Sequence, residues 1–187
     1  SEGSKAYFCQ EPRIVVQGNA PQNNFRRLIA APIKKGTFCL YTINFIPESK
    51  ASQPLAFFLG LLNSKLCEWY FRLGSTSAHA NQYQLHVLPC PAFADKATAA
   101  DRKMLADVLA VLNAWGAGTG SKADPADPEQ MIREVCRILQ PAMAVPPYGQ
   151  AVRDTIVELV KRITAIEAAR GEIARTERSH LAPAAQP

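Results

Sequence analysis

Two segments of this sequence carry side chains that could read the surface of a nucleic acid. The first, residues 17–24, is rich in amides, and the second, residues 75–82, combines hydroxyls, an imidazole and further amides. Asn and Gln can form two hydrogen bonds with an adenine edge, which a hydroxyl cannot, whereas hydroxyls and amides can donate to phosphate oxygens. The candidate DNA contacts in these segments are Gln17, Asn19, Gln22, Asn23, Asn24, Ser75, Thr76, Ser77, His79, Asn81 and Gln82.

Both segments have plainer interpretations. Asn and Gly tolerate turn geometry, so the first segment is equally well explained as a turn-forming loop. The hydroxyls of the second segment favour phosphate or structural roles over base choice. His79 as a catalytic base is a weak hypothesis, because no nucleophile lies beside it in the sequence.

Paired basic residues supply the candidates for phosphate contacts, namely Arg26, Arg27, Lys34 and Lys35. The formal net charge is +5, and the excess lies in the first half: residues 1–93 hold nine Lys or Arg and four acids. A basic surface attracts phosphate and releases counterions on binding. A net charge of this size also occurs in small domains for solubility alone. If Arg26 and Arg27 lie on a regular strand, they cannot both face a duplex, because neighbouring side chains alternate.

The elements that would position these residues begin with strands. Residues 13–17 read as a short buried strand. Residues 25–31 and 37–46 read as two further strands joined by the 32–36 turn, and the second of them is apolar on both faces, which predicts an interior strand.

One long helix is predicted over residues 54–73, because apolar residues recur at steps of three and four. Pro54 suits its first turn and Gly74 its end. Residues 85–88 then resemble a short strand that stops at Pro89. The predicted buried face of the helix consists of Leu55, Phe58, Leu59, Leu62, Leu66, Trp69, Tyr70 and Leu73.

After residue 94 the composition shifts to Ala and charge, and helices are expected. Thr98 caps a helix over 99–115, a flexible linker covers about 116–126, and a second helix starts at Pro128. A final helix over about 150–178 has a coiled-coil-like apolar seam. We therefore predict an α+β fold: a small mixed or antiparallel sheet with a central buried helix over residues 1–93, followed by a helical extension over 94–187.

The cellular setting follows from cysteines and hydropathy. The five cysteines, an odd number without paired close spacing, predict reduced thiols in apolar surroundings and a cytoplasmic protein without a zinc site. No long apolar run predicts a membrane span. The chain begins at Ser1 without methionine, and we expect it to be a fragment of a longer protein.

The segment around the predicted helix resembles the TaqI-like C-terminal specificity domain of type IIG restriction-modification adenine methyltransferases. The resemblance covers residues 13–93 and is looser beyond them. Its motifs are Leu62-Asn63-Ser64-Lys65-Leu66, Trp69-Tyr70-Phe71-Arg72, Ser75-Thr76-Ser77, His79, Asn81, Tyr83-Gln84-Leu85 and Leu88-Pro89-Cys90-Pro91.

The resemblance implies a target recognition domain that binds double-stranded DNA for a methyltransferase domain in cis. The parent protein would use S-adenosylmethionine, and a fused nuclease would need magnesium. Neither site is expected in this chain, which should have no activity by itself. Val145-Pro146-Pro147-Tyr148 differs from the methyltransferase motif Asn-Pro-Pro-Tyr at its first residue, where Val cannot accept a hydrogen bond, so we interpret it as a bend between helices.

Two other functions remain open at this point. The final helix could dock on a partner chain, which would make the protein an interaction module. Glu48-Ser49-Lys50 has the Glu-x-Lys spacing of one family of metal-dependent nucleases, but that chemistry needs an upstream Asp, and residues 1–47 contain none.

Overall fold

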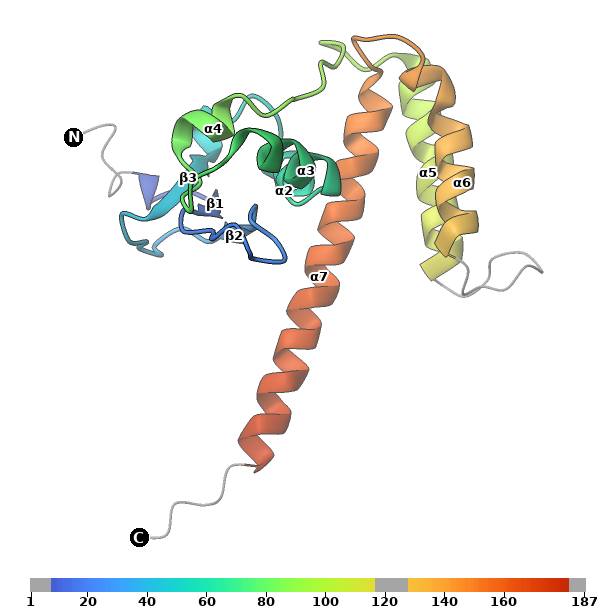
Figure 1. Ribbon diagram of the computed structural model, residues 1–187. Coiled ribbons are helices and arrows are strands. Elements are labelled where there is room, and N and C mark those ends of the chain that lie inside the picture. The colour runs from blue at the N-terminus through green and yellow to red at the C-terminus, as the bar shows by residue number, and fades with distance from the viewer. Residues whose placement is uncertain (1–7, 117–127, 182–187) are drawn as a thin grey trace, which may run out of the picture.

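The computed structural model describes residues 8–116 and 128–181, and in that part of the chain three antiparallel strands form one sheet. β1 (Arg13–Gln17) is central and pairs with β2 (Ala30–Ile33) on one side and β3 (Ile43–Pro47) on the other. Figure 1 shows this sheet beside the long helix α7 (Gln150–Leu181), with a helix pair on the far side of α7. The predicted α+β class with an antiparallel sheet is confirmed.

The strand predicted at 13–17 is confirmed, but the two strands after it were placed wrongly. Residues 25–29 and 37–42 lie in loops, so β2 and β3 are shorter than expected and begin later. The predicted interior strand is in fact β3, an edge strand, because β1 pairs with both neighbours. Ile14 and Val16 of β1 supply the buried centre of the sheet.

The single helix predicted over 54–73 is two helices, α2 (Leu55–Leu62) and α3 (Lys65–Gly74). Ser64 caps α3, and its hydroxyl accepts from the Cys67 N–H at 3.1 Å. The amide of Asn63 bonds both the N–H and the C=O of Ala30, at 3.1 and 2.9 Å. The Asn63 side chain thus satisfies main-chain groups of β2 that a neighbouring strand would otherwise pair with. This contact fixes the position of the break between α2 and α3.

The face of α3 was also predicted wrongly. Cys67 and Phe71 are buried, whereas four residues of the predicted core are exposed. α3 turns this way because Glu68 points toward main-chain N–H groups of the 27–28 segment. The exposed members of the predicted face are Leu66, Trp69, Tyr70 and Leu73.

Residues 85–88 do not form the predicted strand, because α4 (Gln82–His86) occupies the first part of this segment. The main core joins the sheet to α2 and α3. Its buried residues are Ile14, Val16, Leu28, Ala30, Leu62, Cys67, Phe71 and Ala80.

The helical half agrees closely with expectation. Thr98 caps α5 (Ala99–Gly116): its hydroxyl accepts from the Asp101 N–H at 3.0 Å, and Asp101 Oδ2 accepts from the Thr98 N–H at 2.9 Å. The predicted linker lies almost wholly outside the described residues. The remaining elements are η1 (Glu48–Lys50), α6 (Pro128–Leu139), η2 (Gln140–Met143) and α7 (Gln150–Leu181).

α7 contacts both halves of the structure. A second core of α5, α6 and α7 contains Val108, Leu112 and Ala151. On its other side α7 packs against α2, where a Cβ on Gly60 would lie 2.8 Å from Val160 Cγ2, so glycine permits the close approach. α7 extends past the end of the α5–α6 pair (Figure 1). Ile163 and Ile166, near the middle of α7, are exposed.

Two other expectations concern single residues. Residues 144–149 bend between η2 and α7, as predicted. All five cysteines are free, but Cys90 and Cys136 are exposed, so the expectation of apolar surroundings was wrong for these two.

Candidate nucleic-acid interface

The two polar segments singled out in the sequence lie side by side. A bridge pairs Asn19 with His79, the Ala20 N–H donates to the Ala78 carbonyl at 2.7 Å, and the Ala80 N–H donates to the Gly18 carbonyl at 2.8 Å. We call residues 18–25 and 75–82 together the polar platform. Loops separated by some fifty residues of sequence therefore present one surface.

The platform continues from the end of β1 and rests on β3. A Cβ on Gly18 would lie 1.9 Å from the Thr42 carbonyl oxygen, so the close approach of these two segments requires glycine. Asn44 on β3 donates its side-chain amide to the Ala80 carbonyl at 2.7 Å. Both loops are thereby anchored to the sheet.

Arg27 holds the two loops together from inside. Its side chain is 1% exposed, and its guanidinium donates to the carbonyls of Ala20 (3.0 Å), Ser75 (2.8 Å) and Ser77. It also donates to the Ser75 hydroxyl at 3.0 Å and lies 5.0 Å from the centre of the Phe71 ring. Burial, and then repulsion from Arg72, lower the pKa of Arg27, while Glu68 raises it.

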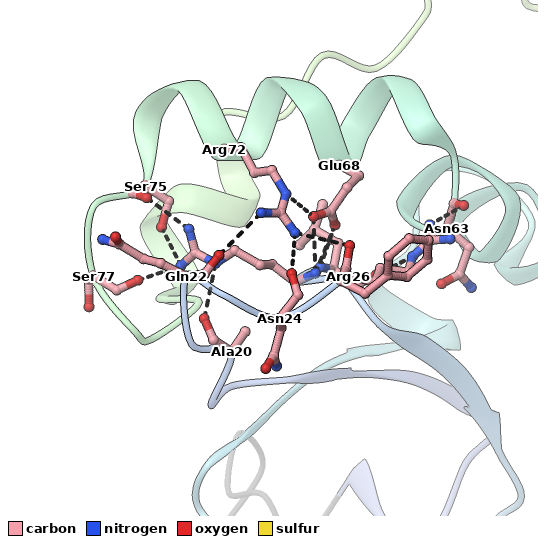
Figure 2. Close-up of polar contacts among 12 residues, drawn as sticks. Ala20, Gln22, Asn24, Arg26, Asn63, Glu68, Arg72, Ser75 and Ser77 are labelled. Carbon is pink, nitrogen blue, oxygen red and sulfur yellow. Dashed lines mark hydrogen bonds and ion pairs between the residues drawn. The ribbon is translucent and has the colours of Figure 1, made fainter.

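An ion pair on α3 holds the first loop from the other side, as Figure 2 shows. Arg72 Nε lies 2.6 Å from Glu68 Oε1. The Arg72 guanidinium donates to the carbonyls of Gln22 (3.3 Å), Asn24 (2.7 Å) and Phe25 (3.2 Å). We call this pair the α3 clamp.

Glu68 completes the clamp by accepting main-chain N–H groups. Arg27 N–H donates to its two oxygens at 3.0 and 3.1 Å, and Leu28 N–H donates at 2.7 Å. Partial burial alone would raise the pKa of Glu68. The N–H groups of Leu28 and Arg27, together with the Arg72 guanidinium, outweigh burial and hold that pKa below its usual range.

The interior positions of Arg27 and Ser75 contradict their prediction as DNA contacts. Both are buried, and each is the hydrogen-bond partner of the other. Arg26 is half-buried, and its Nε and Nη2 atoms donate to the carbonyls of Leu28 (2.8 Å) and Asn63, which leaves its other N–H donors unoccupied.

Most of the other predicted residues do lie on the platform surface. Seven have exposed side chains: Asn19, Gln22, Asn23, Thr76, His79, Asn81 and Gln82. Asn24 and Ser77 are half-buried, as is Gln17, whose amide donates to the Asn19 carbonyl at 2.6 Å.

Some of these exposed groups are hydrogen-bonded within the platform. His79 Nδ1 lies 2.8 Å from Asn19 Oδ1, and the Gln22 amide donates to the Thr76 carbonyl. The Asn81 N–H donates to Gln84 Oε1 at 2.9 Å. Among the exposed predicted residues of the platform, within the described part of the chain, the side chains of Asn23, Thr76 and Gln82 form no such bond, which leaves two amides and a hydroxyl available to another molecule.

Lys34 and Lys35 are exposed but lie away from the platform. They follow β2 after Ile33, which pairs with Arg13 at the start of β1, whereas the platform follows the end of β1. Four residue steps of strand separate these ends by about 13 Å. The paired lysines and the amides therefore occupy opposite ends of the sheet.

Positive charge is in excess around the platform. No acid occurs in the sequence between Glu11 and Glu48, or between Glu68 and Asp95. The side chain of Glu68 is only 14% exposed and is occupied by the clamp. Arg26, Arg27 and Arg72 therefore lie in or beside the platform, and the Glu68 carboxylate offsets one of these three positive charges.

Sequence reasoning missed the clamp. Glu68 and Arg72 stand four residues apart, a spacing that allows a helical ion pair. The spacing does not indicate that both side chains also bind the main chain of residues 22–28. Likewise, the pattern of the 25–31 segment gave no sign that its arginines turn inward.

No family model, curated protein or solved structure matches this chain. Within residues 8–116 and 128–181, no helix is long and apolar enough to span a bilayer.

Proposed function

We propose that this chain binds double-stranded DNA in a sequence-specific manner, as the target recognition part of an adenine-specific DNA methyltransferase. One observation carries the proposal: two amide-bearing loops are joined edge to edge on a fixed main chain, with Asn19, Asn23 and Gln82 exposed. Base readout needs donors and acceptors at fixed positions, which such a platform provides.

The electrostatic setting supports an anionic partner. The platform lacks an exposed acid and lies beside three arginines. In this proposal the half-exposed Arg72 faces the phosphate backbone, and the amides face base edges. The resemblance over residues 13–93 supports the same partner.

The chemical step belongs to other parts of the parent protein. The methyltransferase domain in cis would bind S-adenosylmethionine, and a nuclease would bind magnesium. The residues of this chain would choose the site and orient the duplex, and the chain by itself would have no activity.

A selection from a pool of duplexes with a randomised core tests the proposal. The wild-type chain should enrich a defined sequence, and its affinity should fall with salt at a slope of about −0.9 per phosphate neutralised. An Asn23→Ala/Gln82→Ala variant should discriminate less well between bases, by roughly 1–3 kcal/mol for each bidentate amide–base pair that it removes.

A Lys34→Ala/Lys35→Ala variant is the matched control, because these lysines lie at the other end of the sheet. It should leave base discrimination unchanged and alter at most the salt slope. A wild-type chain that binds no duplex at low salt would refute the proposal. Equal loss of discrimination in the two variants would refute the assignment of readout to the platform.

Two exposed isoleucines of α7 favour a second candidate, an interaction module that docks on a partner chain. Ile163 and Ile166 are exposed beside Arg162, whose guanidinium donates to Asn113 Oδ1 of α5 at 2.7 Å. Absence of duplex binding, combined with a self-association or partner complex that Ile163→Asp disrupts in sedimentation experiments, would favour this function.

A further inference from the structure

The ring of Phe25 is fully exposed, at 103% of its reference area. Burying such a side chain would contribute about 1.5–3 kcal/mol to folding, and this chain forgoes that gain. The next two residues in the sequence differ from it: Arg26 is half-buried and Arg27 is buried. The Phe25 ring is therefore exposed next to two long side chains that are partly or wholly covered.

The main chain around this ring is held on both sides. Arg72 binds the carbonyls of Asn24 and Phe25, and Glu68 binds the N–H groups of Arg27 and Leu28. Because this backbone is already held in place, binding through the Phe25 side chain adds little cost for ordering the main chain. Phe25 is thus an aromatic side chain that projects from a fixed backbone segment.

The surroundings define what this ring contacts. Asn23, with an available amide, lies two residues before it, and the Arg72 guanidinium donates to the Phe25 carbonyl at 3.2 Å. A partner must therefore offer flat apolar faces, hydrogen-bonding edges and negative charge together. The base stack of a duplex with its phosphates has all three.

We infer that Phe25 is a wedge that inserts at a base step of the bound duplex and partly unstacks it. Apolar side chains are known to act in this way in proteins that kink DNA, and stacking of a base on an aromatic ring stabilises such complexes. This inference rests on the proposed function and adds a distortion of the DNA to it.

The duplex enriched by the wild-type chain, with 2-aminopurine in place of one purine at a time, tests the wedge. This base brightens when it is unstacked. Wild type should brighten the probe at one step, and Phe25→Ala should abolish that signal and weaken binding about tenfold or more. Phe25→Trp should retain both properties.

Phe38→Ala is the matched control, because Phe38 is also exposed, at 77%, and lies near the Arg13 end of the sheet. It should behave as wild type. If wild type binds the duplex and Phe25→Ala binds and brightens it equally, the wedge is refuted while DNA recognition stands. If wild type binds no duplex, the proposed function fails and the wedge fails with it.

Discussion

Replacing Arg27 by methionine should loosen the polar platform and destabilise the whole sheet-containing half. Methionine fills a similar volume but donates no hydrogen bond. The substitution would leave the carbonyls of Ala20, Ser75 and Ser77 and the Ser75 hydroxyl without their donor. A buried acceptor without a partner costs roughly 1–3 kcal/mol. If two of the four remain shielded from water, the loss is about 2–6 kcal/mol.

Urea and thermal unfolding followed by circular dichroism measure this loss. At about 2–4 °C per kcal/mol for a chain of this size, the melting temperature should fall by about 4–24 °C. Arg27→Lys keeps the charge but not the planar fork of donors, so it should lose much of the same stability.

Lys34→Met removes an exposed cation nearby in sequence and serves as the control, with an expected change within about 0.5 kcal/mol. The interpretation of Arg27 as an internal brace would be wrong if Arg27→Met were as stable as Lys34→Met. Wild-type stability of Arg27→Lys would show instead that charge, rather than donor geometry, is what matters.

Three further predictions concern the clamp and the turns. The folded-state pKa of Glu68 lies below its unfolded value of about 4.3, so the contribution of Glu68 to the free energy of unfolding is present above that pH and is lost as the pH falls through the folded pKa. In an acid titration, the free energy of unfolding should therefore fall less steeply for Glu68→Gln than for wild type. Identical slopes would contradict the clamp. Gly18→Ala should lower the urea midpoint strongly, because the new Cβ would collide with the Thr42 carbonyl. Gly74→Ala is the control: its Cβ would have no atom within 4 Å, so the change should be neutral or stabilising by roughly 0.4–1 kcal/mol. Equal midpoints for the two variants would refute the steric argument. Ser64→Ala removes the cap of α3 and should cost about 1 kcal/mol in the same assay, and an unchanged midpoint would mean that the cap contributes nothing.

Regular periodicity was sufficient to predict the helical half. α5, α6 and α7 each have an apolar stripe on an otherwise polar helix, and Thr98 gave a clear start signal. β1 was equally clear, since a run of apolar residues bounded by a glycine loop fits a central strand.

The buried face of α3 could not be predicted, because apolar residues cover more than one face of this helix. Leu66, Trp69 and Leu73 form as regular a stripe as the buried pair Cys67 and Phe71. The choice between these faces is made by hydrogen bonds that Glu68 accepts from a loop forty residues earlier, which no local pattern contains.

The candidate site was predicted in composition but not in arrangement. The exposed amides of the 18–24 and 75–82 loops lie where loop composition placed them, at the surface. Their contact with each other depends on the Asn19–His79 bridge, and the separation of Lys34 from them depends on strand register. Both the bridge and the register are set by tertiary packing, which local sequence patterns do not contain. Whether these residues bind DNA remains a prediction.

The α3 clamp binds only peptide groups, namely three carbonyl oxygens of the first loop and the N–H groups of Arg27 and Leu28 just after it. The identities of residues 23–25 are therefore uncoupled from the shape of the loop. A combinatorial library at these three codons should yield variants that share one backbone yet differ in what they select. Under the proposed function, the same uncoupling would let natural variation change the selected sequence in a few substitutions, without a new fold.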